Sequence, residues 1–335
     1  MAGEVGPAEP VRWGFLSTAR INDRVLDGGV RDAESVDVIA VAGRDKGRVE
    51  DYARERGIER AYAGYDAMLA DPDIEAVYIS LPNSMHAEWS VRALEAGKHV
   101  LCEKPFSRRA ADVERAFDVA TRNDRLLMEA FMYRHNPQTA ELKRLVDAGT
   151  IGTLQAIRCG FRWPVGDPGD IRLSAELDGG SLMDLGTYCV NICRYLAGEP
   201  AHVYGEQAVD ANGVDVRFAG TLVFASGVVA QFDDAVTLPP HAEIEVAGET
   251  GSLLVDDPWL CRRPGIHLRR GEDSLERLPM PAAESYGLEF ENFSAAIRGA
   301  AEPLLGRADA LGQARTLEAL YHSAADGRAV RLATG

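Results

Sequence analysis

The sequence predicts an α/β protein of two domains: an N-terminal doubly wound domain and a C-terminal α+β domain with a large open, mostly antiparallel sheet. Up to about residue 131, apolar strands alternate with charged amphipathic helices, which is typical of parallel βαβ units. Beyond about residue 150, strand-like runs follow one another with few helices between them, which favours an antiparallel sheet. The length of 335 residues also exceeds what one small core organises.

The first domain is expected over residues 11–131, after a short mobile tail over residues 1–10. Its strands are expected at apolar runs rich in β-branched residues, at 11–16, 36–42, 76–81, 99–102 and 126–131. Its helices are expected where amphipathic runs end at Gly or before Asp-Pro, at 45–56, 65–70, 86–96 and 110–122. Right-handed crossovers would then give the doubly wound topology.

The second domain, for substrate binding and oligomerisation, is expected over residues 132–335. Its strands are expected at runs with apolar alternation, at 154–163, 202–209, 216–224, 228–236, 242–247 and 252–255. One long helix is expected from near Asp184 to about Leu196. A final helical region over residues 289–325 is expected to pack back on the first domain.

Composition excludes several classes of protein. The formal net charge of −16 would repel nucleic acid and anionic membranes, so we expect neither as a partner. The five cysteines match no disulfide or zinc spacing, so we expect reduced cysteines and no metal site. No run of about 18 apolar residues and no signal peptide is evident. A cytoplasmic protein is therefore expected.

The first strand leads into a turn that fits a dinucleotide. Residues 14–19 read Gly-Phe-Leu-Ser-Thr-Ala, a degenerate form of a glycine-rich fingerprint. Small side chains would let the backbone approach a pyrophosphate, and the following helix would supply N–H groups. The alternative is a tight turn without a ligand. The cofactor contacts expected here are Gly14, Ser17, Thr18, Ala19, Arg20 and Ile21.

Two further strand ends extend the expected cofactor site. The second strand ends at Gly43-Arg44, where a cation suits the 2′-phosphate of NADP. We therefore expect NADP, with NAD possible; the alternative is that Arg44 is only a solvated residue before a helix. The end of the strand expected at 76–81 should lie beside the nicotinamide, through Leu81, Pro82, Asn83 and His86.

The chemistry is expected after the next strand, which ends at Glu103-Lys104-Pro105. A doubly wound sheet places its ligands at this edge. Proline restricts the backbone of Lys104 to an extended conformation. The Lys104 ammonium could donate to a substrate oxygen, and both Glu103 and Lys104 are expected to contact the cofactor.

Glu-Lys-Pro, preceded by Leu-Pro-Asn-x-x-His over residues 81–86, resembles the Gfo/Idh/MocA family of glucose–fructose oxidoreductase, inositol dehydrogenase and rhizopine-pathway proteins. Residues 179–188, Gly-Gly-Ser-Leu-Met-Asp-Leu-Gly-Thr-Tyr, are similar to the family's glycine pair followed by Asp-x-Gly-x-His or Asp-x-Gly-x-Tyr. The resemblance covers about residues 10–330. It implies a Rossmann domain and an NAD(P)-dependent oxidoreductase acting on a sugar or sugar-like polyol.

The resemblance also implies roles for three residues. Lys104 would polarise the reacting group, Tyr188 would be the acid/base, and Asp184 would orient substrate hydroxyls. Asp184 and Tyr188 are four residues apart and would share a helix face. Because tyrosine, with an ordinary pKa near 10, is a poor base unless a cation lowers that pKa, we expect Lys104 to be the cation. Ser17 departs from the glycine of many relatives.

Charged and aromatic residues at strand and loop ends are candidates for the substrate pocket, because a polyol needs hydrogen bonds and an apolar ring face. Each could instead be an ordinary solvated loop residue. The substrate contacts expected are Arg134, Trp163, Arg172 and Asp184.

Tyrosine at position 188, in place of histidine, resembles the xylose dehydrogenase and deoxysugar ketoreductase branches. The leading hypothesis is an NADP-linked aldose 1-dehydrogenase. The alternatives are a sugar ketoreductase of deoxysugar metabolism and a non-catalytic NADP-binding sensor. The resemblance also implies a homodimer or homotetramer that buries the open sheet face.

Overall fold

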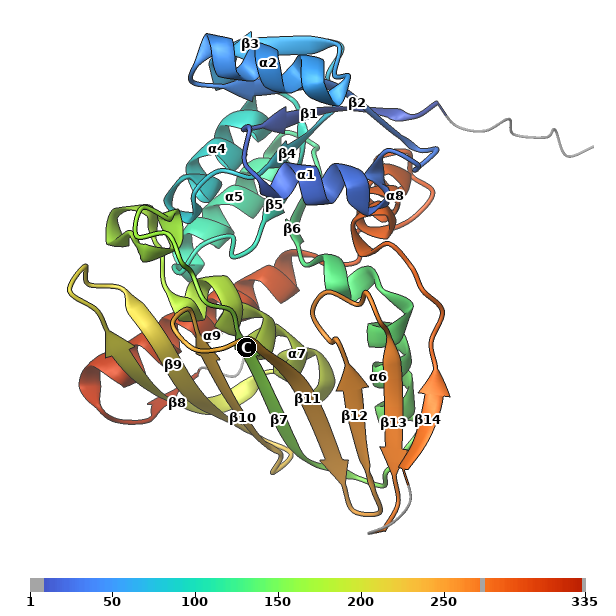
Figure 1. Ribbon diagram of the computed structural model, residues 1–335, viewed down its shortest axis with the longest axis vertical. Coiled ribbons are helices and arrows are strands. Elements are labelled where there is room, and N and C mark those ends of the chain that lie inside the picture. The colour runs from blue at the N-terminus through green and yellow to red at the C-terminus, as the bar shows by residue number, and fades with distance from the viewer. Residues whose placement is uncertain (1–8, 272–274, 333–335) are drawn as a thin grey trace, which may run out of the picture.

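The computed structural model describes residues 9–271 and 275–332 and contains two sheets, one in each half of the chain (Figure 1). Most of the expected tail, residues 1–8, lies outside the described residues. Glu9 and Pro10 are exposed, and their carbonyls accept hydrogen bonds of 3.0 Å from the Arg298 guanidinium.

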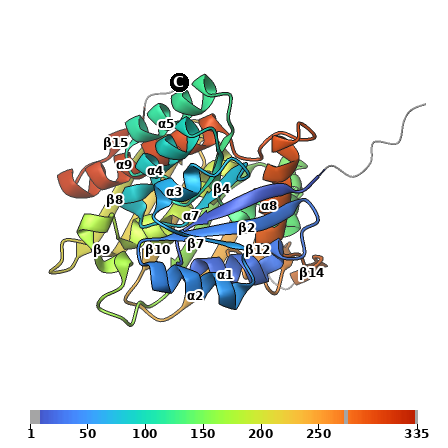
Figure 2. The same ribbon diagram turned by 90° about the horizontal axis from the view of Figure 1, so that it is seen from above.

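The first sheet has six parallel strands in the order β3-β2-β1-β4-β5-β6. The strands are β1 (Val11–Leu16), β2 (Val36–Gly43), β3 (Arg60–Ala63), β4 (Ala76–Ile79), β5 (His99–Glu103) and β6 (Leu127–Ala130). The helices are α1 (Ile21–Val25), the π-turn η1 (Leu26–Val30), α2 (Lys46–Arg56), α3 (Tyr65–Leu69), α4 (Asn83–Glu95) and α5 (Ala110–Arg122). Figure 2 shows α1 and α2 on one face of this sheet and α4 and α5 on the other. The expected doubly wound fold is confirmed.

The strand order reverses between β1 and β4, so the crevice for a ligand lies outside the carboxyl ends of these two strands. Local sequence signals set the two ends of α2, which follows β2. Asp45 caps α2 by accepting the Arg48 backbone N–H at 2.8 Å, and Gly57 ends this helix at φ +68°. The edge strand β3 was not predicted, because its four residues are mostly half-buried and do not alternate between apolar and polar.

The second sheet has nine described strands in the order β14-β13-β12-β11-β7-β10-β9-β8-β15. Only β7 and β10 pair in parallel; the other neighbours are antiparallel. The strands are β7 (Leu154–Arg162), β8 (Pro200–Val209), β9 (Asp215–Phe224), β10 (Val229–Ala235), β11 (His241–Gly248), β12 (Ser252–Asp256), β13 (Gly265–Arg269), β14 (Leu275–Pro279) and β15 (Val330–Arg331). The expected mostly antiparallel sheet is confirmed, although its short strands β13 to β15 were not predicted.

The second half of the chain also contains helical segments ahead of the final helical region. They are the short η2 (Met132–His135), α6 (Pro137–Asp147), η3 (Ile171–Leu173), η4 (Ala175–Leu177), the π-turn η5 (Leu182–Gly186) and α7 (Thr187–Ala197). Helix α6 was not predicted, although Asn136 caps it and Pro137 occupies its first turn. The packing of α6 on β13, and of α7 on β7 and β10, buries one face of the second sheet, while alternate side chains of the strands point away from it.

The expected final helical region is two helices, α8 (Ser285–Ile297) and α9 (Arg307–Asp326), because Gly299 at φ +72° follows the first. Helix α8 packs back on the first domain, where Trp13 lies 4.6 Å from the Phe290 ring and donates to Ser294 Oγ at 3.2 Å. Helix α9 passes between the sheets, against α5, α7 and β8 (Figure 1). The two helices thereby fasten the domains together.

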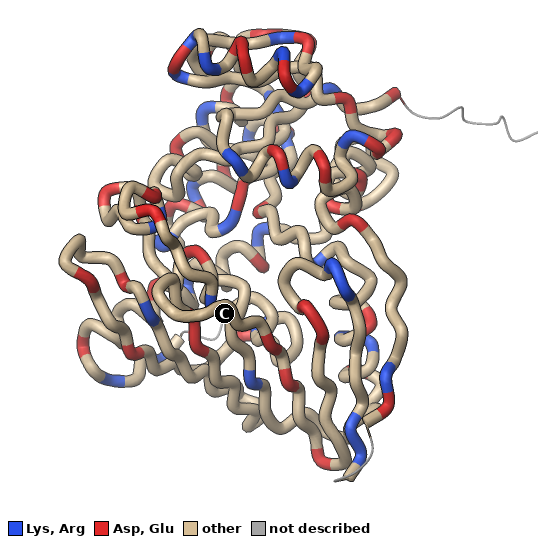
Figure 3. The backbone as a smooth tube through the Cα atoms, in the orientation of Figure 1, with Lys and Arg blue, Asp and Glu red and all other residues tan. Residues whose placement is uncertain are grey.

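Three expectations from composition can be compared with the described residues. All five cysteines are buried and free. No helix among the described residues is long and apolar enough to cross a membrane. Figure 3 shows Lys and Arg interspersed with Asp and Glu over both domains. Within the described ranges, no group of His, Cys, Asp and Glu could hold a metal ion.

Candidate active site

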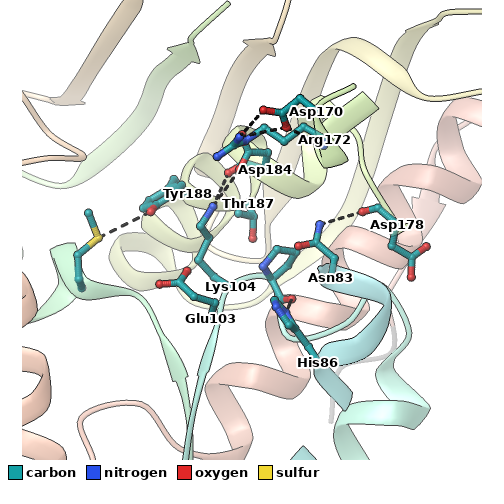
Figure 4. Close-up of polar contacts among 12 residues, drawn as sticks. Asn83, His86, Glu103, Lys104, Asp170, Arg172, Asp178, Asp184, Thr187 and Tyr188 are labelled. Carbon is teal, nitrogen blue, oxygen red and sulfur yellow. Dashed lines mark hydrogen bonds and ion pairs between the residues drawn. The ribbon is translucent and has the colours of Figure 1, made fainter. Parts of the chain in front are cut away.

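The site lies where the carboxyl end of β5 meets the start of a continuous helix over residues 181–197. This helix 181–197 consists of η5 followed by α7. Lys104 follows β5, and its bond to Pro105 is cis. Asp184 lies in η5 and Tyr188 in the first turn of α7. Figure 4 shows the Lys104 side chain reaching toward both of them. The structure therefore brings together the three residues expected to be catalytic.

Three groups surround the Lys104 ammonium. Its Nζ donates to the Asp184 backbone carbonyl at 2.8 Å and to Asp184 Oδ1 at 3.3 Å. The same atom lies 4.8 Å from the centre of the Tyr188 ring, which is the geometry of a cation–π contact. Asp184 and Tyr188 thus face one cation from one helix, as expected.

Asp184 is bound by cations on both of its carboxylate oxygens. Arg172 Nε donates to Oδ2 at 2.7 Å, and Arg172 also pairs with Asp170 at 3.1 Å. Burial acts to raise the pKa of Asp184, but Lys104 and Arg172 outweigh it and hold that pKa below its ordinary value. Asp184 is therefore an ionised acceptor, suited to holding a substrate hydroxyl. Arg172 acts on it from the loop side, so its position is compatible with the expected substrate contact.

Tyr188 is enclosed by aromatic side chains. Its ring packs edge-on against Phe131 at 5.8 Å and Phe161 at 5.5 Å, and lies 5.8 Å from Trp259. Its hydroxyl lies 3.7 Å from Met132 Sδ. Phe161 and Trp259 were not predicted as neighbours; Phe161 lies near the end of β7, and Trp259 lies in a loop that carried no signal.

The expectation that Lys104 lowers the pKa of Tyr188 is wrong for the described chain. Burial raises the pKa of Tyr188 well above its ordinary value, and nearby groups including Glu103 and Asp184 raise it further. Lys104 lies against the ring face, so its charge does not offset this cost. The phenol is therefore protonated and suited to donating a proton.

The first βα turn has the geometry of a nucleotide-binding loop despite its serine. Ser17 has φ +151°, a conformation that glycine adopts more readily. The Ser17 hydroxyl hydrogen-bonds Ser80 Oγ at 2.8 Å, and Asn22 Nδ2 donates to the Ser17 carbonyl at 2.8 Å. These bonds hold the turn against β4, and the following Thr18 and Ala19 remain partly accessible.

The end of β2 fits the 2′-phosphate of NADP. A Cβ on Gly43 would lie 3.2 Å from the Val49 side chain and 3.6 Å from Thr18, so a larger residue here would press on α2. Asp45 is occupied as a helix cap. Arg44 is exposed and has no hydrogen bond or ion pair within residues 9–271 and 275–332. Arg48 reaches the Thr18 carbonyl at 3.3 Å. A pair of arginines and no free carboxylate therefore borders this end of the turn.

The residues after β4 support the site in different ways. Asn83 donates to the Asp178 carbonyl at 2.8 Å and so bridges the two domains. His86 is buried, and its ring nitrogens lie 2.7 Å from the Leu81 carbonyl and 2.9 Å from the Pro105 carbonyl. His86 thus ties the loop after β4 to the loop after β5, and its expected contact with the cofactor stays a prediction.

Two expected substrate contacts differ in their exposure, and both stay predictions. Arg134 is only 8 % exposed; its guanidinium stacks 3.6 Å from the Tyr195 ring centre and donates to Asn191 at 3.1 Å. It lies behind α7, because η2 directs its side chain into the interior. Trp163 is compatible with the expectation: it is 50 % exposed at the end of β7, two residues beyond Phe161 on the same side of the strand.

Glu129 was not predicted, although it lies in β6 directly beside the end of β5. Its Oε1 accepts the Phe106 backbone N–H at 2.7 Å, and its Oε2 is buried without a hydrogen-bond partner in the described chain. Burial raises the pKa of Glu129 to about 8, although the Phe106 N–H opposes the shift. Glu129 therefore supports the loop after Lys104 as a neutral acid.

Comparisons with known proteins agree with this geometry. Residues 11–131 match the oxidoreductase family with an NAD-binding Rossmann fold, and residues 139–254 match the GFO/IDH/MocA C-terminal domain. The chain is 34 % identical to D-xylose 1-dehydrogenase (NADP(+)) 2 of Haloferax volcanii, over 96 % of this chain and 99 % of that protein. It is 32 % identical to dTDP-3,4-didehydro-2,6-dideoxy-alpha-D-glucose 3-reductase of Actinomadura kijaniata, over 95 % and 97 %.

A solved structure is similar throughout its length. It is a 3-ketoreductase from Actinomadura kijaniata in complex with NADP and TDP-benzene, with 31 % identity, a TM-score of 0.88, and coverage of 94 % of this chain and 98 % of that one. Together with the matched domains and the Lys104, Asp184 and Tyr188 cluster, this likeness confirms the resemblance. The chain belongs to the Gfo/Idh/MocA family of oxidoreductases.

Proposed function

We propose that the protein is an NADP-dependent aldose 1-dehydrogenase, which oxidises a sugar at its anomeric carbon. The observation that carries the proposal is the Lys104 ammonium, held 3.3 Å from Asp184 Oδ1 and over the Tyr188 ring. It lies at the sheet edge where this fold binds its dinucleotide. The xylose 1-dehydrogenase from Haloferax volcanii, similar over nearly the whole chain, supports this substrate class.

The residues divide the work of alcohol oxidation. When bound, the nicotinamide ring accepts or returns the hydride. The Lys104 ammonium hydrogen-bonds the reacting oxygen and stabilises negative charge that develops on it. Asp184, held by Arg172 at 2.7 Å, accepts a neighbouring sugar hydroxyl. Tyr188 exchanges the proton of the reacting hydroxyl, and the exposed Trp163 offers a flat surface to the sugar ring.

A second candidate is the reverse reaction on a ketosugar, as in deoxysugar assembly. Burial raises the pKa of Tyr188, so its protonated phenol favours donating a proton to a carbonyl oxygen being reduced. The similar dTDP-linked 3-reductase supports this alternative. The two candidates use the same residues and differ in the substrate.

NADP is the proposed cofactor because Arg44 is exposed and Asp45 is already used as a helix cap. A free guanidinium suits a 2′-phosphate, whereas NAD would call for a free carboxylate at this strand end.

We also propose that the protein is a homodimer or homotetramer in the cytoplasm, with the outer face of the second sheet as the interface. The exposed side chains of Tyr204 on β8 and Val229 on β10 alternate with buried residues and so lie on this face. Large apolar side chains on an open sheet are consistent with an interface. The five free cysteines support a reducing compartment.

The substrate class is tested with two assays on the purified protein. NADP with a panel of pentoses and hexoses is expected to yield reduced nicotinamide and an aldonolactone identified by mass spectrometry. If no aldose is oxidised but NADPH reduces a nucleotide-linked ketosugar, the second candidate replaces the first. Tight NADP binding with turnover in neither assay would contradict both.

A further inference from the structure

Two carboxyl groups lie beneath the turn that begins helix 181–197, outside the contacts described for the reaction. Asp215 starts β9 and is 4 % exposed, and Asp234 lies near the end of β10 and is 1 % exposed. A Cβ on Gly180 would lie 2.2 Å from Asp215 Oδ1, and one on Gly186 would lie 2.2 Å from Asp234 Oδ2. Gly180 and Gly186 are therefore required by the close approach of these two carboxyl groups.

Asp215 ties the start of the helix to α9. Its Oδ2 accepts the Leu182 backbone N–H at 2.8 Å, and its Oδ1 accepts the Tyr321 hydroxyl at 3.0 Å. Leu182 is one of the first residues of the helix, whose N–H groups have no partner within the helix itself. Asp215 therefore acts as a cap supplied from a distant strand.

Asp234 contacts both ends of the π-turn. Its Oδ1 accepts the Ser181 hydroxyl. Its Oδ2 faces Gly186 and is buried with no hydrogen-bond partner in the described part of the chain. Burial raises the pKa of Asp234 well above its ordinary value, Ser181 opposes the shift and Asp215 adds to it. The carboxyl group therefore spans the turn from residue 181 to residue 186.

The register of this turn decides which atoms meet Lys104. Residues 182–186 are wound as a π-turn before the α-helical residues 187–197, so the turn offsets Asp184 from the regular helix that carries Tyr188. The Asp184 backbone carbonyl and its carboxylate both contact the Lys104 ammonium. A change in the winding of this turn would shift these acceptors relative to Lys104.

We propose that Asp234 and Asp215 are positioning residues, which hold the glycine turn and so fix Asp184 and Tyr188 about Lys104. The catalytic part of the proposal rests on the proposed oxidoreductase function. The structural part does not, because it concerns the helix itself.

The structural part is tested by hydrogen–deuterium exchange of peptides covering residues 181–197 in the full-length protein. Asp234→Ala is expected to speed amide exchange in this segment about tenfold, because local stability sets the exchange rate. Asp234→Asn is expected to leave it within about twofold, since the amide keeps the shape of the carboxyl group and its oxygen can accept from Ser181. Asp233→Ala is the matched control, because Asp233 pairs with Arg162 on the opposite face of the same strand.

Kinetics test the catalytic part. Asp234→Ala is expected to lower kcat about tenfold or more while the KM for NADP stays within about twofold, because small misplacements of reacting groups are costly. Asp234→Asn is expected to restore kcat. Should Asp234→Ala fail to fold, Ser181→Ala removes the hydroxyl donor instead and is expected to speed exchange in the same segment.

Three results would overturn the proposal. They are unchanged exchange and kcat in Asp234→Ala, equal effects of Asp233→Ala and Asp234→Ala, or an Asp234→Asn variant as impaired as the alanine variant. If the wild-type protein oxidises and reduces no sugar, the proposed function fails, and the exchange experiment still decides whether these residues hold the turn.

Discussion

The ion pair between Lys104 and Asp184 joins a cation of the first domain to an anion of the second. Lys104 comes from the first domain, and both of its polar contacts are to Asp184 in the second. In the proposed reaction, the substrate oxygen would therefore enter beside an ammonium that already has an anionic partner. Such preorganisation costs little reorganisation during the reaction, which is why fixed charges stabilise transition states effectively.

Removing this charge is the first prediction at the residue scale. Lys104→Met keeps the length of the stem but removes the ammonium, and is expected to lower kcat about 100-fold or more. The pKa of Asp184 is expected to rise, because Lys104 is one of the two cations that lower it. Steady-state kinetics with the sugar and NADP check the first effect. A variant with wild-type kcat would exclude Lys104 from the chemistry.

Arg44 tests the assignment of the cofactor. Arg44→Ala is expected to weaken NADP binding about 10- to 100-fold, the range of one charge-assisted hydrogen bond. NAD binding is expected to change little, because NAD has no 2′-phosphate. Fluorescence titration measures both affinities. Arg54→Ala, which changes an exposed arginine paired with Asp51, is the control, and equal losses for NADP and NAD would contradict the assignment.

Glu129 makes stability depend on pH. Its folded pKa of about 8 lies above the ordinary value of 4.5, so the folded state retains a proton that the unfolded state loses. Wild-type stability should therefore fall, relative to Glu129→Gln, as pH rises from about 5 to about 8, by at most about 1.4 kcal/mol per pH unit. Thermal unfolding of both proteins across this range checks the sign. The exposed Glu291→Gln is the control, and a difference that does not grow with pH would contradict the account.

At the scale of elements, helix 181–197 is shaped by what lies beneath it. Gly186→Ala is expected to destabilise the protein by about 1–3 kcal/mol, because its Cβ would lie 2.2 Å from Asp234 Oδ2 in a packed interior. Gly166→Ala is the matched control, since a Cβ there meets nothing within 4 Å. Denaturant unfolding measures both variants. If Gly186→Ala were as stable as Gly166→Ala, the close contact between position 186 and Asp234 would be contradicted.

The strands show how much of the fold could be predicted from the sequence. Strands β1, β2, β4 and β5 were predictable because buried parallel strands are continuous apolar runs. The edge strands β3 and β14 were not, since their residues are half-buried or exposed and pair on one side only.

The same limit applies to the candidate site. Lys104, Asp184 and Tyr188 could be predicted because local motifs carry them. Asp215 and Asp234 could not, because their strands approach the helix only through tertiary packing. The stacking of Arg134 on Tyr195 was not predicted, because nothing local distinguishes an arginine stacked in the interior from one that faces the site.

At the scale of the whole molecule, the site needs a fixed arrangement of the dinucleotide domain and the second domain. Helices α8 and α9 fasten the second sheet to the dinucleotide domain, so the site is built across a fixed junction. The outer face of the second sheet carries the exposed apolar side chains of Tyr204 and Val229. Its use as an interface is a prediction about assembly.

Thr221→Lys tests that interface. Thr221 lies in β9 opposite Tyr204 and Gln231, so the lysine would place a charge in the middle of the proposed interface. Light scattering is expected to give an oligomer for the wild-type protein and smaller species for the variant. Asn212→Lys, in the exposed turn after β8, is the control. A monomeric wild-type protein would contradict the proposed assembly.

The central claim is that the protein catalyses hydride transfer between NADP and a sugar at the cluster of Lys104, Asp184 and Tyr188. In this account, Tyr188 carries the proton. The most direct test is the rate of change in absorbance of the reduced nicotinamide, with wild-type protein and Tyr188→Phe side by side. The account predicts turnover by the wild-type protein and a loss of about 10²- to 10⁴-fold in kcat for the variant, with NADP affinity unchanged. A phenylalanine variant that turns over at the wild-type rate would contradict it.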